Sequence, residues 1–297
     1  MRILLIGVTG QVGHELFAGL SNLGDVFPTR ALGEDSEAIE LDLADPWHVA
    51  VVIDDVRPDV IVNAAAYTAV DRAESEFETA MKINGDALAT IGREAKRIGA
   101  TVVHYSTDYV YSSHGEHYLE EHEREDPINV YGATKLAGDH ALATSGADYM
   151  IFRTSWVYGI VGNNFVKTML RLGMEKEALS VVSDQFGLPT SARTLADITA
   201  MALTAKRPNG IYHVVNSGNA VSWHQFATTI FELAYECGYQ GKIKEVLPIC
   251  SEQYKTPALR PKNSRLSCKK LHDVLGIKPA EWRTMLEWSL PLILKTL

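Results

Sequence analysis

The stretch RILLIGVTGQVG, residues 2–13, decides the fold of this 297-residue chain. A continuous apolar run ends in a glycine, which is typical of a buried parallel strand, and a helical pattern follows at once. Gly7, Gly10 and Gly13 are spaced G-x-x-G-x-x-G, whereas the dinucleotide-binding fingerprint is G-x-G-x-x-G. Such a turn lets the backbone approach a pyrophosphate, and the helix N-terminus offers free N–H groups. The alternative is a tight structural turn without a ligand.

Strand-like and helix-like stretches alternate over the first half of the chain. Buried strands are predicted in DVIVNAAA, ATVVHYST and DYMIFRTSWVYG, which are residues 59–66, 100–107 and 148–159. A helical stretch from about 75 to 99 separates the first two. This rhythm predicts a Rossmann-type doubly wound parallel sheet, with helices covering both faces.

The second half of the chain is less regular, and GIYHVVN (residues 210–216) is its clearest strand. We expect a dinucleotide-binding domain formed by residues 1–156 and about 190–217. Residues of about 157–189 and 218–297 would form a smaller, discontinuous α/β substrate domain.

Composition and charge exclude several classes of protein. The net charge of −9 provides no basic stripe for nucleic acid or an anionic membrane. Three cysteines without metal or redox spacing favour reduced thiols and a cytoplasmic location. The histidines and acids of HGEHYLEEHERED (residues 114–126) match no metal-ligand spacing, so we expect a solvated loop and no metal.

The choice of cofactor depends on the end of the second predicted strand, DVFPTR. An acidic residue that binds the ribose is expected there, but Arg30 occupies the position. Because arginine accommodates a 2′-phosphate, we expect NADPH to serve at least as well as NADH. A solvated arginine is the alternative. In LDLAD, Asp42 and Leu43 are suitably placed to contact the adenine edge and cover its face.

Two motifs carry the expected chemistry. HYSTDYVY places Thr107 and Asp108 at the carboxyl end of a buried strand, where ligands sit in open α/β sheets. NVYGATKLAG places Tyr131 and Lys135 one helical turn apart. A lysine ammonium would favour the phenolate of Tyr131 and lower its pKa from roughly 10. Thr107 would then orient a carbonyl oxygen, Tyr131 would protonate it, and Lys135 would tune Tyr131 and bind the nicotinamide ribose.

A tyrosine and a lysine at this spacing also occur by chance on amphipathic helices. The glycine turn, the strand-end Thr107 and the Tyr131–Lys135 pair occur here in that chain order, and together they favour a reductase. Asn163 in GNNFVKTML and Arg260 in RPKNSRL supply an amide and a cation suited to a nucleotide diphosphate. The alternative for each is a surface loop or a helix cap.

These motifs resemble the extended short-chain dehydrogenase/reductase family over nearly the entire chain, from RILLIGVTGQVGHEL to RPKNSRL. The resemblance implies reduction of the C4 ketone of dTDP-4-dehydro-L-rhamnose to dTDP-L-rhamnose with NADPH or NADH. For the cofactor, it implies that Gly10, Gln11 and Val12 hold the pyrophosphate and that Asp42 and Leu43 flank the adenine. It also implies that Ala66, Tyr67 and Thr68 line the cofactor groove and that Tyr105 lies against this groove. For the substrate, it implies that Thr107 and Asp108 touch the sugar nucleotide and that Trp156 packs against the deoxysugar.

Two rival functions stay open. One is a reductase of another nucleotide-linked 4-ketosugar, which sequence does not separate from the first. The other is a non-catalytic, cofactor-binding regulatory subunit, against which the complete set of Thr107, Tyr131 and Lys135 argues. The resemblance also allows a homodimer.

Overall fold

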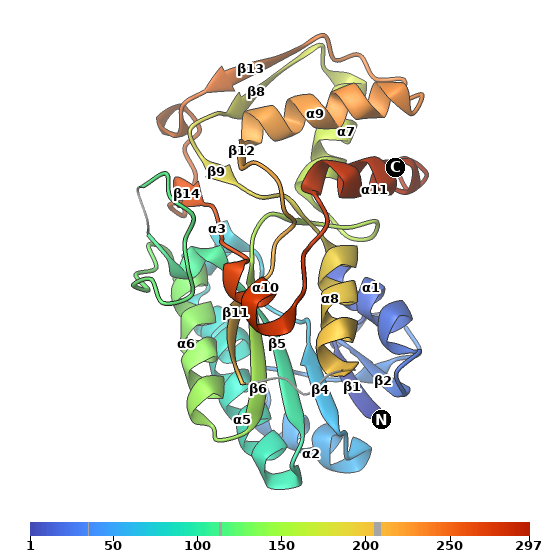
Figure 1. Cartoon of the computed structure of the whole chain (residues 1–297), viewed down its shortest axis with the longest axis vertical. Helices are drawn as coiled ribbons and strands as arrows, with labels where there is room; N and C mark the ends of the chain where they lie inside the picture. Colours follow the sequence, from blue (N-terminus) through green and yellow to red (C-terminus); the bar gives the residue numbers. More distant parts are fainter. Residues whose placement is uncertain (35, 113–114, 205–208) are drawn as a thin grey trace.

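A parallel sheet forms the lower part of the molecule in Figure 1. The computed structural model describes residues 1–34, 36–112, 115–204 and 209–297. Within them the sheet has seven strands in the order β11-β6-β5-β4-β1-β2-β3, and all its pairings are parallel. Its strands are β1 (Arg2–Ile6), β2 (Asp25–Arg30), β3 (Ile39–Glu40), β4 (Val60–Asn63), β5 (Thr101–Thr107), β6 (Asp148–Thr154) and β11 (Gly210–His213).

Helices cover both faces of this sheet, which confirms the predicted fold class. One face packs against α1 (Gln11–Leu20), α8 (Ala192–Thr204) and α10 (Lys269–Leu275). The other packs against α2 (Pro46–Val56), α5 (Ala87–Ile98) and α6 (Val130–Thr144). The strand order reverses between β1 and β4, and ligands bind at the carboxyl ends of strands beside such a switch point.

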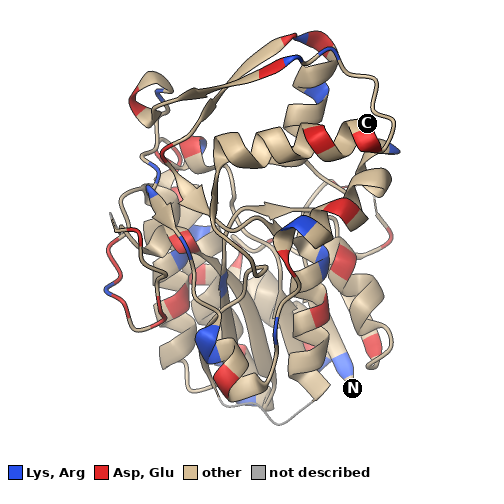
Figure 2. Cartoon of the chain, turned by 45° about the horizontal axis from the view of Figure 1, so that its top comes forward, with Lys and Arg blue, Asp and Glu red and all other residues tan. Residues whose placement is uncertain are grey.

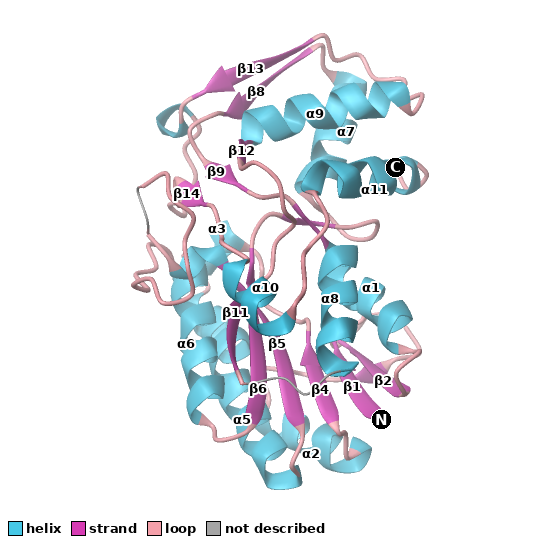
Figure 3. Ribbon diagram, in the orientation of Figure 1, coloured by secondary structure: helices cyan, strands magenta, loops and turns pink. Residues whose placement is uncertain are grey.

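A smaller α/β part lies above the sheet in Figures 1 and 3. Its apolar core is built largely from α7 (Phe165–Glu175), α9 (Trp223–Glu236), α11 (Trp282–Leu294) and the parallel pair β8 (Ala178–Val182) and β13 (Glu245–Ile249). Short strands form two further small sheets, one of β7 (Val157–Tyr158) and β10 (Thr190–Ser191), the other of β12 (Val221–Ser222), β9 (Phe186–Gly187) and β14 (Asn263–Ser264). The remaining helical segments are α3 (Val70–Ala73), α4 (Phe77–Met81), the π-helical η1 (Lys82–Asp86) and the 3-10 turns η2 (Asp108–Val110) and η3 (Ser251–Gln253).

The strand predicted over residues 148–159 is wrong in its second half. β6 ends at Thr154, and the backbone of Trp156 has a φ of 50°. This left-handed conformation turns the chain out of the large sheet, and β7 then pairs with β10. The helical stretch predicted from about 75 to 99 is confirmed, since α4, η1 and α5 follow one another without a break over residues 77–98, and η1 is a π-helical turn in its middle.

The predicted division into two domains stays a prediction, but one segment crosses it. Residues 218–297 are assigned to the substrate domain, yet α10 lies on the large sheet. Its Leu271 and Leu275 are buried in the same cluster as Leu16 and Leu20 of α1. The chain therefore returns to the lower part before α11 completes the upper one (Figure 1).

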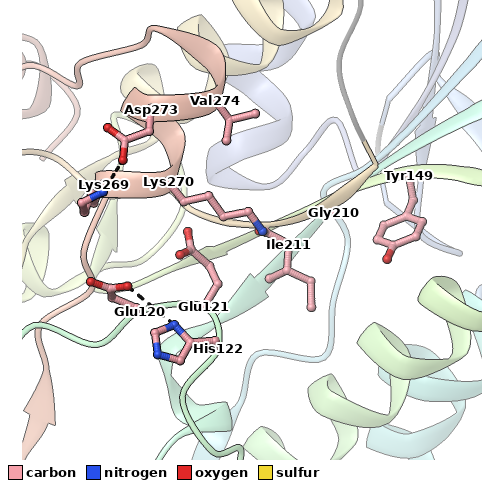
Figure 4. A pocket seen from close by; sticks show the side chains of 10 residues that line it. All are labelled: Glu120, Glu121, His122, Tyr149, Gly210, Ile211, Lys269, Lys270, Asp273 and Val274. Atoms are coloured by element: carbon pink, nitrogen blue, oxygen red, sulfur yellow. Dashed lines mark hydrogen bonds and ion pairs between the residues drawn. The ribbon is translucent and has the colours of Figure 1, made fainter.

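Side chains close the edge of the sheet at β11. Glu121 Oε1 accepts a hydrogen bond from the backbone N–H of His213 at 2.7 Å. Lys270 Nζ donates to the carbonyl of Ile211 at 2.8 Å. Both side chains line an open depression of about 540 Å³ beside the strand (Figure 4). Its other charged groups pair with each other, Lys269 with Asp273 and His122 with Glu120.

Acidic and basic residues are interspersed over both parts of the molecule, as Figure 2 shows. This distribution agrees with the mildly acidic net charge of the chain.

Candidate functional site

The glycine turn has the geometry of a phosphate-binding turn. Gly7 has a φ of 87°, and a Cβ added there would lie 2.8 Å from the Cβ of Ala65. A Cβ at Gly13 would lie 1.9 Å from the carbonyl oxygen of Gly7, so only glycine lets α1 start this close to β1. Helix α1 begins after Gly10 without a side-chain cap. Its first N–H groups and the positive end of its dipole thus suit the pyrophosphate expected beside Gly10, Gln11 and Val12.

Gln11 connects this turn to the upper part of the molecule. Its Oε1 accepts a hydrogen bond from Asn164 Nδ2 at 2.9 Å. Asn164 also donates to the Gly159 carbonyl and caps α7 by accepting from the Lys167 backbone N–H. The predicted Asn163 next to it is exposed, and its Oδ1 accepts from Arg171 instead. The sequence predictions therefore missed Asn164, which shares a motif with Asn163.

The sequence predictions considered only Arg30 at the end of β2, but the carboxylates of Glu34 and Glu40 lie there as well. Arg30 forms an ion pair with Glu40 at 2.8 Å and donates to the carbonyls of Ser36 and Ala31. Glu34 Oε2 accepts from Thr9 Oγ1 at 2.7 Å, so a carboxylate also lies beside the glycine turn. The predicted 2′-phosphate contact would require Arg30 to share its guanidinium between Glu40 and the cofactor.

The residues predicted to flank the adenine lie after β3. Asp42 Oδ1 accepts from the Ala44 backbone, and the Leu43 side chain is mostly buried in the core below. The groove residues Ala66, Tyr67 and Thr68 follow β4. Tyr67 donates to Glu76 at 2.6 Å, and Asn84 of η1 bridges Tyr67 to Thr134 of α6.

Tyr131 and Thr107 meet at the carboxyl end of β5, as predicted. Thr107 Oγ1 donates to Asp108 Oδ1 at 3.1 Å, and its hydroxyl lies close enough to the phenol of Tyr131 to lower the pKa of that group. Helix α6 can reach this position because Gly132 passes close to the chain after β5, where a Cβ would lie 2.2 Å from the Tyr109 carbonyl. Asn129 caps the helix by accepting from the Gly132 N–H at 2.7 Å.

The predicted effect of Lys135 on Tyr131 is wrong for the structure as it stands. Burial raises the pKa of Tyr131 above its ordinary value, and the carboxylates of Asp108 and Asp139 raise it further. Thr107 alone opposes this rise by its hydrogen bond. Lys135 is not among the groups that shift the pKa of the phenol. Its Nζ donates to the Tyr105 carbonyl at 2.6 Å and lies 3.0 Å from His104 Nε2.

Lys135 itself is perturbed by its surroundings. Its side chain is only 1% exposed, and burial lowers its pKa to about 8 against the opposing charge of Asp139. The backbone carbonyl that accepts a hydrogen bond from Lys135 Nζ belongs to Tyr105, which the resemblance places against the cofactor. Its phenol is bonded to Thr199 on the face of the sheet covered by α1 and α8.

The pKa of Asp108 is also shifted by its surroundings. Burial raises its pKa to about 6, although hydrogen bonds from Ser264 and Thr107 lower it. Its Oδ2 has no hydrogen-bond partner among the described residues. Ser264 belongs to β14 of the upper part and was not predicted. Its only sequence signal was its place in the motif RPKNSRL.

Trp156 and Arg260, two of the predicted sugar-binding residues, have partners within the protein. The Trp156 ring stacks on that of Trp223 with centroids 3.5 Å apart, and a Cβ at Gly187 would meet the edge of the Trp156 ring at 2.7 Å. Arg260 uses both terminal nitrogens on the carboxylate of Asp71, at 3.0 and 2.9 Å. Contacts of Trp156, Arg260 and Asn163 with a ligand stay predictions.

A metal centre finds no support in the part of the chain that the structure describes. No group of three or more histidine, cysteine or acidic side chains there is arranged to hold an ion. His114 lies outside the described residues. Among the helices that are described, none combines the length and apolar character needed to cross a membrane.

The sheet order, the glycine turn and the Thr107–Tyr131–Lys135 set define a reductase of the short-chain dehydrogenase class. The family model described as "RmlD substrate binding domain" matches residues 1–293. The dTDP-4-dehydrorhamnose reductase of Escherichia coli (strain K12) is 45% identical over 287 residues, which cover 95% of each chain. This chain therefore belongs to the dTDP-4-dehydrorhamnose reductase family, as predicted.

Solved structures agree with this assignment. A dTDP-4-dehydrorhamnose reductase from Clostridium acetobutylicum superimposes with a TM-score of 0.91 at 35% identity, over 99% of this chain and all of that one. The enzyme of that name from Bacillus anthracis, in complex with NADP, gives a TM-score of 0.89 at 36% identity over 97% and 98% of the two chains. The predicted reductase class is confirmed.

Proposed function

We propose that this protein reduces the C4 ketone of dTDP-4-dehydro-L-rhamnose to dTDP-L-rhamnose, using NADPH or NADH as hydride donor. One observation carries the proposal. A phenol, a threonine hydroxyl and a buried lysine converge at the carboxyl end of β5, in a sheet whose first turn suits a pyrophosphate. The name of the Escherichia coli relative supports the choice of substrate, and the NADP complex of the Bacillus anthracis relative supports the choice of cofactor.

The residues present fit a nicotinamide cofactor, which would supply the hydride when bound. The glycine turn and the start of α1 would hold the pyrophosphate. Tyr131 would donate a hydrogen bond to the ketone oxygen, and Thr107 would join it by turning its hydroxyl proton from Asp108 Oδ1 to that oxygen, which fixes the orientation of the ketone. Because the pKa of Tyr131 is raised, the phenol keeps its proton at neutral pH and can donate it to the oxygen as negative charge develops there.

Asp108 would bind the substrate but take no part in the proton transfer. Asp108 lies beside Thr107, and its unpartnered Oδ2 is an acceptor for a sugar hydroxyl. Ser264, which lies close enough to Asp108 to lower its pKa, would make the upper part of the molecule sensitive to the sugar in the site. Trp156 would pack against the apolar face of the deoxysugar.

The test is a product assay. Purified protein is mixed with dTDP-4-dehydro-L-rhamnose and each reduced nicotinamide cofactor, and the sugar nucleotide formed is identified by NMR. We expect cofactor oxidation matched by formation of dTDP-L-rhamnose. Oxidation only with a different nucleotide-linked 4-ketosugar would favour the first rival. Cofactor binding without oxidation by any ketosugar would favour the regulatory subunit. A cytoplasmic location and a homodimer stay predictions.

A further inference from the structure

The proposed reaction leaves one buried histidine beside Lys135 without a role. His104 lies on β5 and is completely buried, and Lys135 Nζ is 3.0 Å from its Nε2. Its Nδ1 is 3.2 Å from the side-chain amide of Asn63, which is also completely buried on the neighbouring strand β4. A buried imidazole on a central strand is therefore in direct contact with the amine of the site.

The contact has a defined direction when Lys135 is charged. An ammonium group can only donate hydrogen bonds, so Nε2 of His104 must accept from it. The ring proton then lies on Nδ1 and is directed to the Asn63 backbone, so the 3.2 Å approach of Asn63 Nδ2 to Nδ1 joins two donors and is a contact, not a hydrogen bond. Burial and the nearby lysine keep the pKa of His104 well below its ordinary value, so the ring stays neutral and able to accept.

Few other groups face the lysine. The Tyr105 carbonyl accepts its second hydrogen bond at 2.6 Å. Asp139, one turn further along α6, raises the pKa of Lys135 by its charge, but its Oδ2 already accepts from Ser106 and Arg153. His104 and the Tyr105 carbonyl are thus the two groups that fix Nζ in place.

We propose that His104 is a positioning residue, which accepts a hydrogen bond from Lys135 Nζ and holds the ammonium in the place from which it would bind the cofactor ribose. The inference rests on the proposed function, because the position of Lys135 matters only where a cofactor ribose and a reacting ketone meet. The Tyr105 carbonyl belongs to the backbone and survives substitution. Of the two groups that accept a hydrogen bond from Lys135 Nζ, His104 is therefore the one that a substitution can remove.

Two substitutions separate the acceptor from the volume of the ring. His104→Leu keeps a buried side chain of similar size without an acceptor, whereas His104→Gln carries a carbonyl oxygen close to the place of Nε2. We expect kcat to fall about tenfold to a hundredfold in His104→Leu, the factor expected for one hydrogen bond to a charged group. His104→Gln should recover most of this loss, and the KM for the sugar nucleotide should change little in either variant.

A double-mutant cycle distinguishes positioning from general damage. In a Lys135→Met background, His104→Leu should lower kcat no further, because the group it supports is gone. An equal fall in both backgrounds, or a His104→Leu enzyme with normal kcat, would overturn the proposal.

A direct titration of Lys135 avoids dependence on activity. The protein is labelled with 13C at lysine Cε, and the resonance that disappears in Lys135→Met is followed against pH by NMR. Loss of an acceptor destabilises the ammonium, so the titration should move to lower pH by about one pH unit in His104→Leu and stay in place in His104→Gln. An unchanged titration in His104→Leu contradicts the proposal. Because this readout needs no ketosugar, it separates failure of the inference from failure of the proposed function.

Discussion

Asn164 of the upper part donates a hydrogen bond to Oε1 of Gln11 in the glycine turn, at 2.9 Å. The residue that caps α7 thus also fixes a side chain at the start of α1. The loop that enters the upper part and the predicted pyrophosphate site are held by one amide.

This relationship predicts the effect of Asn164→Ala. Loss of the cap should lower the free energy of unfolding by about 1 kcal/mol. Gln11 and the loop at Gly159 would also lose their hydrogen bonds to Asn164. The KM for NADPH should therefore rise several-fold, as measured by steady-state kinetics. Asn163→Ala is the matched control, since Asn163 is exposed and caps no helix. A larger effect of Asn163→Ala on cofactor KM would contradict this assignment, and an effect on sugar-nucleotide KM would support its predicted substrate contact.

Removal of the phenolic hydroxyl tests the acid of the reaction. Tyr131→Phe should lower kcat by about 100-fold or more, because a positioned proton donor contributes that much. Binding of the sugar nucleotide, measured by calorimetry, should survive. Tyr109→Phe is the control, since the Tyr109 ring packs edge-on against Tyr131 with centroids 5.7 Å apart. Near-normal turnover in Tyr131→Phe would refute the role given to this residue.

The raised pKa of Asp108 makes stability depend on pH. The folded protein holds this proton more tightly than the unfolded chain. The resulting stability is complete below about pH 3.8 and is lost as the pH rises through about 6. A rise from 3.8 to about 6 corresponds to about 3 kcal/mol.

Asp108→Asn should therefore stabilise the protein above pH 6, by up to about 3 kcal/mol, and have little effect near pH 4. Urea unfolding at several pH values measures the difference. The exposed Asp55→Asn should show no such dependence. Sugar-nucleotide binding should weaken in Asp108→Asn, since the proposed acceptor loses its charge.

The buried ion pair between Asp139 and Arg153 should be costly to break. Both side chains are completely buried, and Arg153 Nε donates to Asp139 Oδ2 at 3.0 Å. Arg153→Met leaves the Asp139 carboxylate uncompensated, so the free energy of unfolding should fall by about 3–5 kcal/mol. Adding Asp139→Asn should restore part of that loss. Arg193→Met, at the exposed pair with Asp197, should cost less than about 1 kcal/mol.

The cofactor preference depends on how Arg30 divides its charge. If Arg30 reaches a 2′-phosphate, Arg30→Ala should raise the KM for NADPH about tenfold and leave the KM for NADH nearly unchanged. Glu40→Gln removes the competing ion pair and should lower the KM for NADPH. Equal effects of Arg30→Ala on both cofactors would show that this arginine is only a structural partner of Glu40.

The sequence predicted the features that local pattern controls. The apolar run of β1 and its glycines specify a strand–turn–helix unit on their own, and Thr107 and Tyr131 meet because a strand end and a helix start fix each of them. The break at Trp156 was missed, since a left-handed backbone at a residue other than glycine leaves no pattern to read.

Contacts between distant parts of the chain were beyond sequence reasoning. Ser264 reaches Asp108, and Arg260 binds Asp71, only after the upper part has folded onto the sheet. His104 was missed for a different reason. A histidine within a buried strand is indistinguishable in sequence from any other core residue. Only the packing of α6 against β5 shows that His104 faces Lys135.

The closed edge at β11 has a consequence for assembly. An exposed edge strand offers unpaired N–H and C=O groups to which another chain can add a strand. Here the carboxylate of Glu121 and the ammonium of Lys270 take those places at His213 and Ile211. Two copies of this protein should therefore not join into one continuous sheet across β11, and a homodimer would have to form through other surfaces. Glu121 and Lys270 thus protect the sheet against strand-by-strand aggregation.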